Sequence, residues 1–337
     1  MARGKIALSN RPLLPSADDA ALFIDRAGLV GRIERALAQN LNVLLIGDWG
    51  SGRTSLLRHL VWLNNITEDP LHMVYVDGAR TQSTIGVIEE VRTELSRPRH
   101  IGTAASVALR SLGNFRAAPS ASSVALEYLR DLREDDPATI LLDGLPSAEV
   151  GQTLFGALRD ELWQLPYTWV LAAHVRDKAA LLTPPADAFW DVELRLDPFT
   201  PDETRKLLRA RLDDEALVDE LVHLGDGNPR HQIALARDVL LEGRSPSDLQ
   251  QRHTEEEVRL QEVGRAAYML MHEVRALGRP VSASDDELLR RMGWTRQRTA
   301  RVLQQLETNG FLESYAGLTE GQGRPPRLFR VPGTVDE

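Results

Sequence analysis

The sequence of 337 residues contains no cysteine, which excludes disulfide bonds, thiolate zinc sites and a cysteine nucleophile. Lysine is also scarce: of the 40 basic residues only Lys5, Lys178 and Lys206 are lysines, so 37 are arginines. No apolar run approaches the roughly 18 residues that a transmembrane helix needs, and prolines and Arg11 interrupt the N-terminal segment. We therefore expect a cytoplasmic protein that does not contact membranes.

Acidic residues outnumber basic ones by 49 to 40, which gives a formal charge of −9. This balance disfavours a protein that coats nucleic acid with its whole surface, although a local patch can oppose the average. Residues 290–330 form such a patch, because they contain eight arginines against three glutamates. The length predicts two or three domains, each large enough to bury a core.

The first two thirds of the chain predict an α/β fold in which helices wrap a parallel sheet. Short apolar runs predict five strands, at residues 42–46, 73–76, 138–142, 168–173 and 192–196. Helical patterns lie between them, for example at 85–95 and 123–133. Residues 96–120 carry Pro, Gly, Ser and Arg with poor periodicity and predict an irregular insertion.

After residue 198 the pattern changes to helices only, predicted at 201–212, 216–224, 230–241 and, as one long helix, 254–277. We accordingly predict four parts in the chain. They are an N-terminal arm (1–20), a nucleotide-binding core (21–198), a helical lid (199–253) and a winged-helix domain (254–337).

A glycine-rich segment, Gly47–Thr54, follows the first strand and opens a predicted helix. It matches the phosphate-loop pattern G-x-x-x-x-G-K-[ST] except at one position. In this pattern glycines let backbone N–H groups converge on phosphate oxygens at a helix N-terminus, and the Thr54 hydroxyl reaches Mg²⁺. The predicted nucleotide contacts in this segment are Gly47, Gly50, Ser51, Gly52, Arg53, Thr54 and Ser55.

Arg53 is the exception, because it stands where the pattern has lysine. Lysine is a compact point charge that follows the β- and γ-phosphates. Arginine keeps the charge but is longer, planar and forked. We expect Arg53 to bind phosphate while placing its charge poorly for hydrolysis.

The third predicted strand ends in Asp143, a position suited to holding Mg²⁺ together with Thr54. In many ATPases an acid follows directly and orients the attacking water. Here Gly144 follows, and the next acid is Glu149. The expected general base is missing, so whether the chain is an enzyme stays open.

Taken together, these motifs resemble those of AAA+ ATPases, in particular STAND proteins and origin-recognition initiators, over residues 21–250. Phe23–Arg26 is similar to the F-V-G-R-E motif near the adenine, which implies nucleotide contacts for Asp25 and Arg26. The resemblance also implies bound ATP or ADP with Mg²⁺, and it places His174 at the sensor 1 strand and Arg230 at sensor 2. Alternatively, His174 is a histidine at a strand end whose hydrogen bonds are satisfied by its neighbours. Arg230, in turn, could be a solvated residue in the first turn of a helix. No arginine stands at the arginine-finger position.

The end of the chain, residues 280–331, resembles a winged helix-turn-helix domain. Its second helix carries side chains of the types that reach phosphates and base edges. The candidate DNA contacts are Arg296, Arg298, Arg301, Arg324 and Arg327. In STAND proteins, however, such a domain often binds protein instead.

The sequence therefore predicts an ATP/ADP-binding switch with weak or absent hydrolysis, coupled to double-stranded DNA through the winged helix. The alternative is a STAND-type scaffold whose winged helix contacts a protein partner or a second copy of the chain. A third possibility is a competent ATPase that a partner completes.

Overall fold

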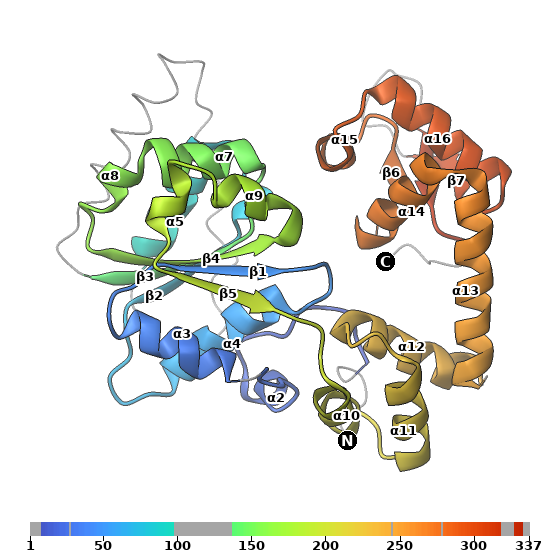
Figure 1. Ribbon diagram of the computed structural model, residues 1–337, viewed down its shortest axis with the longest axis horizontal. Coiled ribbons are helices and arrows are strands. Elements are labelled where there is room, and N and C mark those ends of the chain that lie inside the picture. The colour runs from blue at the N-terminus through green and yellow to red at the C-terminus, as the bar shows by residue number, and fades with distance from the viewer. Residues whose placement is uncertain are drawn as a thin grey trace. The chain divides into compact units, whose positions relative to one another are not determined.

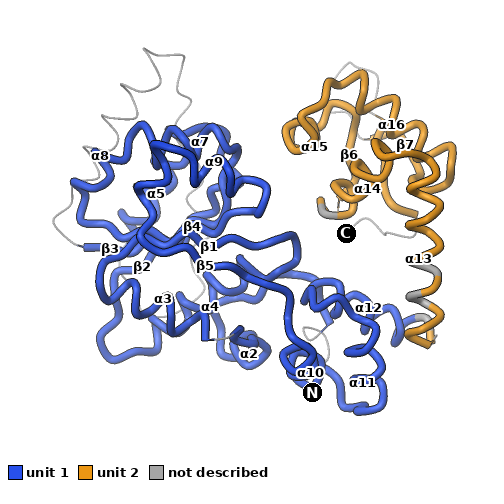
Figure 2. The backbone as a smooth tube through the Cα atoms, in the orientation of Figure 1, with its two compact units in different colours: residues 1–241 blue, residues 242–337 orange. Residues whose placement is uncertain are grey.

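The computed structural model describes residues 8–26, 28–97, 137–243, 245–277, 279–317 and 327–332. The predicted helix at 123–133 and nearly all of the predicted insertion at 96–120 lie outside these residues. The chain divides into two compact units, residues 1–241 and 242–337 (Figure 2). Within the described residues, no helix is both long and apolar enough to cross a lipid bilayer.

The first unit contains a five-stranded parallel sheet in the order β2-β3-β4-β1-β5. The strands are β1 (Val43–Gly47), β2 (Met73–Val76), β3 (Ala138–Asp143), β4 (Tyr167–His174) and β5 (Val192–Leu196). All five predicted strands are confirmed to within a residue or two. Central parallel strands are covered on both faces and so read as continuous apolar runs, which explains why the sequence predicts them well.

Helices cover both faces of this sheet (Figure 1). One face carries α5 (Thr84–Leu95), α7 (Ala148–Gln152), α8 (Arg159–Leu162) and α9 (Lys178–Leu181), and the other carries α3 (Leu29–Leu37) and α4 (Arg53–Asn65). Alternate residues of β1 supply the two cores: Leu44 and Ile46 pack on the α5 side, Val43 and Leu45 on the α4 side. This three-layer packing fixes the carboxyl ends of the strands, where the phosphate loop lies.

The lid consists of three helices that follow β5. They are α10 (Pro201–Arg209), α11 (Glu215–Leu224) and α12 (Pro229–Glu242). A capping box between Thr200 and Glu203 starts α10, and the Asp214 side chain caps α11. The Phe199 N–H donates to the Gly227 carbonyl over 2.8 Å, which ties the start of the lid to the turn before α12.

The second unit begins with two helices, α13 (Pro246–Val263) and α14 (Arg265–Leu277). The prediction of one helix over 254–277 is wrong, because Gly264 adopts φ +127° and breaks it. Helix α13 also starts eight residues before the predicted boundary at 253/254, and its residues group with the second unit. The two units therefore divide at 241/242, at the end of α12, and not within α13.

The rest of the second unit packs helices against a small antiparallel sheet in the order β6-β8-β7. Its elements are β6 (Val281–Ser282), α15 (Asp286–Met292), α16 (Arg296–Thr308), β7 (Glu313–Ala316) and β8 (Arg327–Arg330). Gly293 ends α15 in the left-handed conformation, and the Thr295 hydroxyl caps α16. This is the element order expected of a winged helix, and residues 318–326, between β7 and β8, lie outside the described residues.

Candidate functional site

The loop between β1 and α4 has the backbone that a phosphate loop requires. Gly50 and Gly52 adopt φ values of +73° and +95°, which residues other than glycine rarely adopt. A Cβ atom on Gly47 would lie only 2.6 Å from the Ser51 Oγ. Arg53, Thr54 and Ser55 then form the first turn of α4, whose orphan N–H groups suit an anion.

The lid contacts this loop directly through the start of α12. The Asn228 side-chain amide donates to the Trp49 carbonyl over 2.6 Å. A Cβ atom on Gly50 would lie 2.5 Å from the Asn228 Oδ1 and 2.8 Å from the Arg230 Cβ. Arg230 thus stands beside the phosphate loop, as the lid motif requires, and its contact with nucleotide stays a prediction.

Arg53 lies among aromatic and charged groups at the carboxyl ends of the strands. Its guanidinium carbon is 5.5 Å from the centre of the Trp49 ring, and that of Arg176 is 5.7 Å from the same ring. Burial lowers the pKa of Arg53, while the carboxylates of Asp143 and Asp177 act to raise it. Two arginines therefore share one indole, an arrangement that a single lysine would not make.

Asp143 ends β3 at the same edge of the sheet. Its Oδ2 accepts a 2.7 Å hydrogen bond from the Tyr75 hydroxyl, and burial, together with this carboxylate, raises the pKa of Tyr75. Gly144 follows with φ +75°. Its carbonyl oxygen packs closely on Gly78, where a Cβ atom would lie only 2.3 Å from this oxygen. An acid at position 144 would be strained, which explains in physical terms why none is there. Glu149 is exposed in the first turn of α7.

His174 connects the end of β4 to the phosphate loop. Its Nε2 lies 3.1 Å from the Asp48 Oδ1, and its Nδ1 accepts the Arg176 backbone N–H over 3.1 Å. Burial, with the charges of Arg53 and Arg176, lowers the pKa of His174 to about 4. The imidazole is therefore neutral at neutral pH. Both ring nitrogens are satisfied, and Asp48 of the loop itself is one partner.

The low pKa of His174 predicts a pH-dependent stability. In the unfolded chain the histidine titrates near its ordinary pKa of about 6.5, so the unfolded state takes up the proton first as pH falls. This contribution to stability is complete above pH 6.5 and is lost as pH falls toward 4. We expect the wild type to lose about 2.5 kcal/mol more than His174→Gln between pH 7 and 4.5. Urea unfolding of both proteins at pH 7 and pH 4.5 measures this difference. Equal losses of unfolding free energy in the wild type and in His174→Gln would contradict the low pKa of His174.

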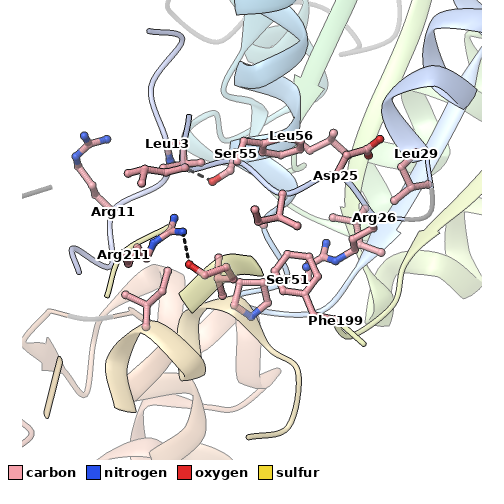
Figure 3. A pocket seen from close by; sticks show the side chains of 18 of the residues that line it. Arg11, Leu13, Asp25, Arg26, Leu29, Ser51, Ser55, Leu56, Phe199 and Arg211 are labelled. Carbon is pink, nitrogen blue, oxygen red and sulfur yellow. Dashed lines mark hydrogen bonds between the residues drawn. The ribbon is translucent and has the colours of Figure 1, made fainter. Parts of the chain in front are cut away.

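A pocket lies beside the phosphate loop, within the first unit (Figure 3). Its cavity volume is about 80 Å³, below the roughly 300–1,000 Å³ of typical small-molecule sites, and it is partly open to solvent. Its walls come from residues 22–26, from Ser51, Gly52 and Ser55 of the phosphate loop and α4, and from the lid. The lining is mostly apolar, which suits a flat base placed next to its phosphates.

Asp25 and Arg26 both line this pocket, as the sequence predicts for neighbours of the adenine. Asp25 accepts the Val30 N–H and so caps the start of α3. The Arg26 guanidinium lies 4.1 Å from the centre of the Phe199 ring, and burial lowers its pKa to about 10. The Arg26 side chain thereby joins the core to the lid across the pocket.

Sequence reasoning missed several residues of this site. Asp48 and Trp49 lie inside the phosphate-loop pattern but at variable positions, so no rule singles them out. Asp177 occupies the N-cap position of α9 without capping it, and its carboxylate faces the charges of Arg176 and Arg53. No sequence signal marked Arg176 or Asp177, because only strand pairing brings them to the loop.

The candidate DNA contacts on the second unit differ in their surroundings. Arg296, Arg298 and Arg301 are exposed along α16, and Arg298 stacks on Trp294 at 4.2 Å. In the described part of the chain Arg296 and Arg301 have no carboxylate partner. Arg327, by contrast, forms an ion pair with Glu307 of α16, in which its Nη2 donates to both carboxylate oxygens over 2.7 Å. Its contact with DNA stays a prediction and would have to compete with this ion pair, whereas Arg324 lies outside the described residues.

No protein-family model and no curated protein matches this sequence. Solved structures do resemble it. The ORC2 protein of Aeropyrum pernix, in ADPNP–ADP complexes, aligns with a TM-score of 0.53 and 14% identity over 99% of this chain and 95% of that one. Cdc6p from Pyrobaculum aerophilum aligns with a TM-score of 0.50 and 16% identity over 94% of each chain. With its five-stranded parallel sheet and phosphate loop, the chain therefore has the fold of an AAA+ P-loop NTPase.

Proposed function

We propose that the protein is a molecular switch that binds ATP or ADP with Mg²⁺ and hydrolyses ATP weakly or not at all. The observation that carries this proposal is the contact between lid and phosphate loop, at Asn228, Trp49 and Gly50. A nucleotide bound at this junction would touch both parts and so favour one lid position over another. The Aeropyrum ORC2 protein, which has a similar fold, was solved with ADPNP and ADP.

The residues present fit a nucleotide and its metal ion. The buried Ser51 Oγ has no hydrogen-bond partner among the described residues, so it is available to a ligand. The α4 N-terminus and Arg53 would hold phosphates, while Thr54 and the Asp143 carboxylate would hold Mg²⁺. Mg²⁺ commonly takes one or two protein ligands and keeps several waters. When bound, it would neutralise phosphate charge.

Weak hydrolysis follows from two features of this chain. Phosphoryl transfer depends mainly on positioned charge and on an oriented water. Arg53 spreads its charge over a fork that lies near Trp49, and Gly144 has φ +75°, a conformation that the usual acid would adopt only with strain. Each feature removes a separate contribution, so both favour a switch that holds its nucleotide.

Calorimetry with ATP and ADP, with and without Mg²⁺, tests this proposal. We expect both nucleotides to bind below millimolar concentration. Mg²⁺ should strengthen ATP binding in the wild type but not in Asp143→Asn. In parallel, phosphate release should be slower than about 1 s⁻¹, the low end of ordinary turnover. Absence of binding at millimolar nucleotide would overturn the proposal. Brisk release that Asp143→Asn abolishes would instead show a competent ATPase.

We further propose that the second unit carries the output, by binding double-stranded DNA through the exposed arginines of α16. Arginine is well suited to phosphates and guanine edges, and these side chains project from one helix. The ion pair between Arg327 and Glu307 favours the alternative, a scaffold that binds protein, because it reduces the free positive charge of this unit. The two proposals differ in their prediction for duplex DNA: the DNA-binding switch should bind it with an affinity that falls steeply as salt rises, whereas the protein scaffold should not bind it.

A further inference from the structure

The N-terminal arm forms one wall of the pocket beside the phosphate loop. Ser9, Arg11 and Leu13 line the pocket, as do Phe199 and Arg211 of the lid. Figure 3 shows Arg11 and Leu13 of the arm among these residues. The arm residues come from a segment without regular structure, residues 8–14, which we call the strap. A chain segment without secondary structure is held in position only by its contacts with other residues. The contacts of the strap therefore decide whether it stays closed over the pocket.

The strap is attached at both ends of the pocket. The Leu13 N–H donates to the Oγ of Ser55, in the first turn of α4, over 3.1 Å. At the other end Leu8 packs on the apolar cluster of the lid, which contains Phe199 and Ile233. The strap therefore runs from the phosphate-binding helix to the lid, and it covers the pocket between them.

The strongest attachment is an ion pair between Arg11 of the strap and Asp19 of α2 (Ala17–Ala20). Asp19 is only 1% exposed, and its carboxylate accepts three hydrogen bonds. Two come from the Arg11 guanidinium, over 2.6 and 3.0 Å, and one from the Leu14 N–H, over 2.6 Å. A buried carboxylate that loses such a partner is left uncompensated, so the strap is costly to open.

The lid contributes a second positive charge near the same carboxylate. Burial lowers the pKa of Arg211 to about 10, and the charge of Asp19 acts to raise it. Arg211 donates a 2.9 Å hydrogen bond to the Leu207 carbonyl, while its Nε has no partner among the described residues. Asp19 is thus hydrogen-bonded to one arginine of the strap and also interacts electrostatically with one of the lid.

We propose that residues 8–14 are a strap that closes the nucleoside pocket, that the Arg11–Asp19 ion pair latches it, and that nucleotide leaves only when this latch opens. Arg11 and Asp19 are then positioning residues, which act on the nucleotide through the strap. This inference rests on the proposed nucleotide binding and adds its regulation. A partner that competed for Arg11 or Asp19 would accelerate nucleotide exchange without touching the phosphate loop.

The dissociation rate of fluorescent methylanthraniloyl-ADP from the full chain tests the latch. Arg11→Gln should release it about 10- to 100-fold faster, as expected for the loss of a charge-assisted bidentate pair. Arg11→Lys should restore part of the slow release, because it keeps the charge. Asp19→Asn should match Arg11→Gln, and the double variant should be no faster than either, since both changes open the same latch.

Arg209→Gln is the matched control. Arg209 also forms a bidentate ion pair, with Glu215, but at an exposed part of the lid that does not line the pocket. Its release rate should equal that of the wild type. Hydrogen exchange gives a second readout: the Leu13 and Leu14 amides should exchange faster in Arg11→Gln than in Arg209→Gln.

The outcomes separate this inference from the proposed function. If the nucleotide binds but leaves Arg11→Gln at the wild-type rate, the latch is wrong and nucleotide binding stands. Equal acceleration by Arg209→Gln would also overturn the latch, because general loss of stability would explain both. If the wild type binds no nucleotide, the proposed function fails and the inference fails with it.

Discussion

Replacing Gly50 with alanine is expected to weaken ADP binding by about 100-fold or more and to destabilise the fold. Gly50 has φ +73°, which costs an alanine about 1 kcal/mol. Its new Cβ would also lie 2.5 Å from the Asn228 Oδ1 and 2.8 Å from the Arg230 Cβ. Overpacking of this kind costs about 1–3 kcal/mol. The variant must therefore displace the lid from the phosphate loop, the junction on which the proposed switch depends.

Urea unfolding and calorimetry measure the two effects of this substitution. We expect the free energy of unfolding to fall by about 2–4 kcal/mol, the sum of backbone strain and overpacking. Gly243→Ala separates the two causes, because Gly243 has φ +63° but a Cβ atom on it would meet no other atom within 4 Å. That control should lose only about 1 kcal/mol and should bind ADP normally. Normal binding by Gly50→Ala would show that contact between lid and loop is dispensable.

Replacing Arg296, Arg298 and Arg301 together with glutamine should remove most of the affinity for duplex DNA. Each phosphate contact releases counterions, so the logarithm of the binding constant falls with the logarithm of salt by about 0.9 per contact. Three lost contacts should therefore reduce this slope by up to about 2.7. The prediction depends on these side chains being exposed along α16.

Arg327→Gln is the informative comparison for this experiment. It also removes one positive charge from the second unit, but Arg327 is already paired with both oxygens of Glu307. Its slope should stay near that of the wild type, whereas Arg296→Gln alone should lower the slope by about 0.9. Fluorescence anisotropy with a labelled duplex over a range of salt measures both. No binding of the wild type at low salt would favour the protein scaffold over the DNA-binding switch.

The sequence predicts the sheet and the phosphate loop because both depend on local information. Central parallel strands are apolar along their whole length, and the glycine spacing of residues 47–54 reports a backbone that only glycine adopts easily. Local patterns fail where one residue overrides them: helical periodicity continues across Gly264, but its φ of +127° ends the helix. The predicted boundary at 253/254 falls inside α13, because the local sequence pattern does not show that one helix runs across this position.

Only the tertiary structure decided which partners the functional side chains have. Asn228 meets Trp49 across 179 positions of the chain, and His174 meets Asp48 across 126. Neither pair could be predicted, because periodicity and motif spacing describe one segment at a time, whereas these contacts require the lid and β4 to pack beside the loop. Arg327 resembled a free DNA contact in the sequence until folding placed Glu307 beside it. The strap belongs to the same class, since a segment without periodicity gains its position from contacts with Asp19, Ser55 and the lid.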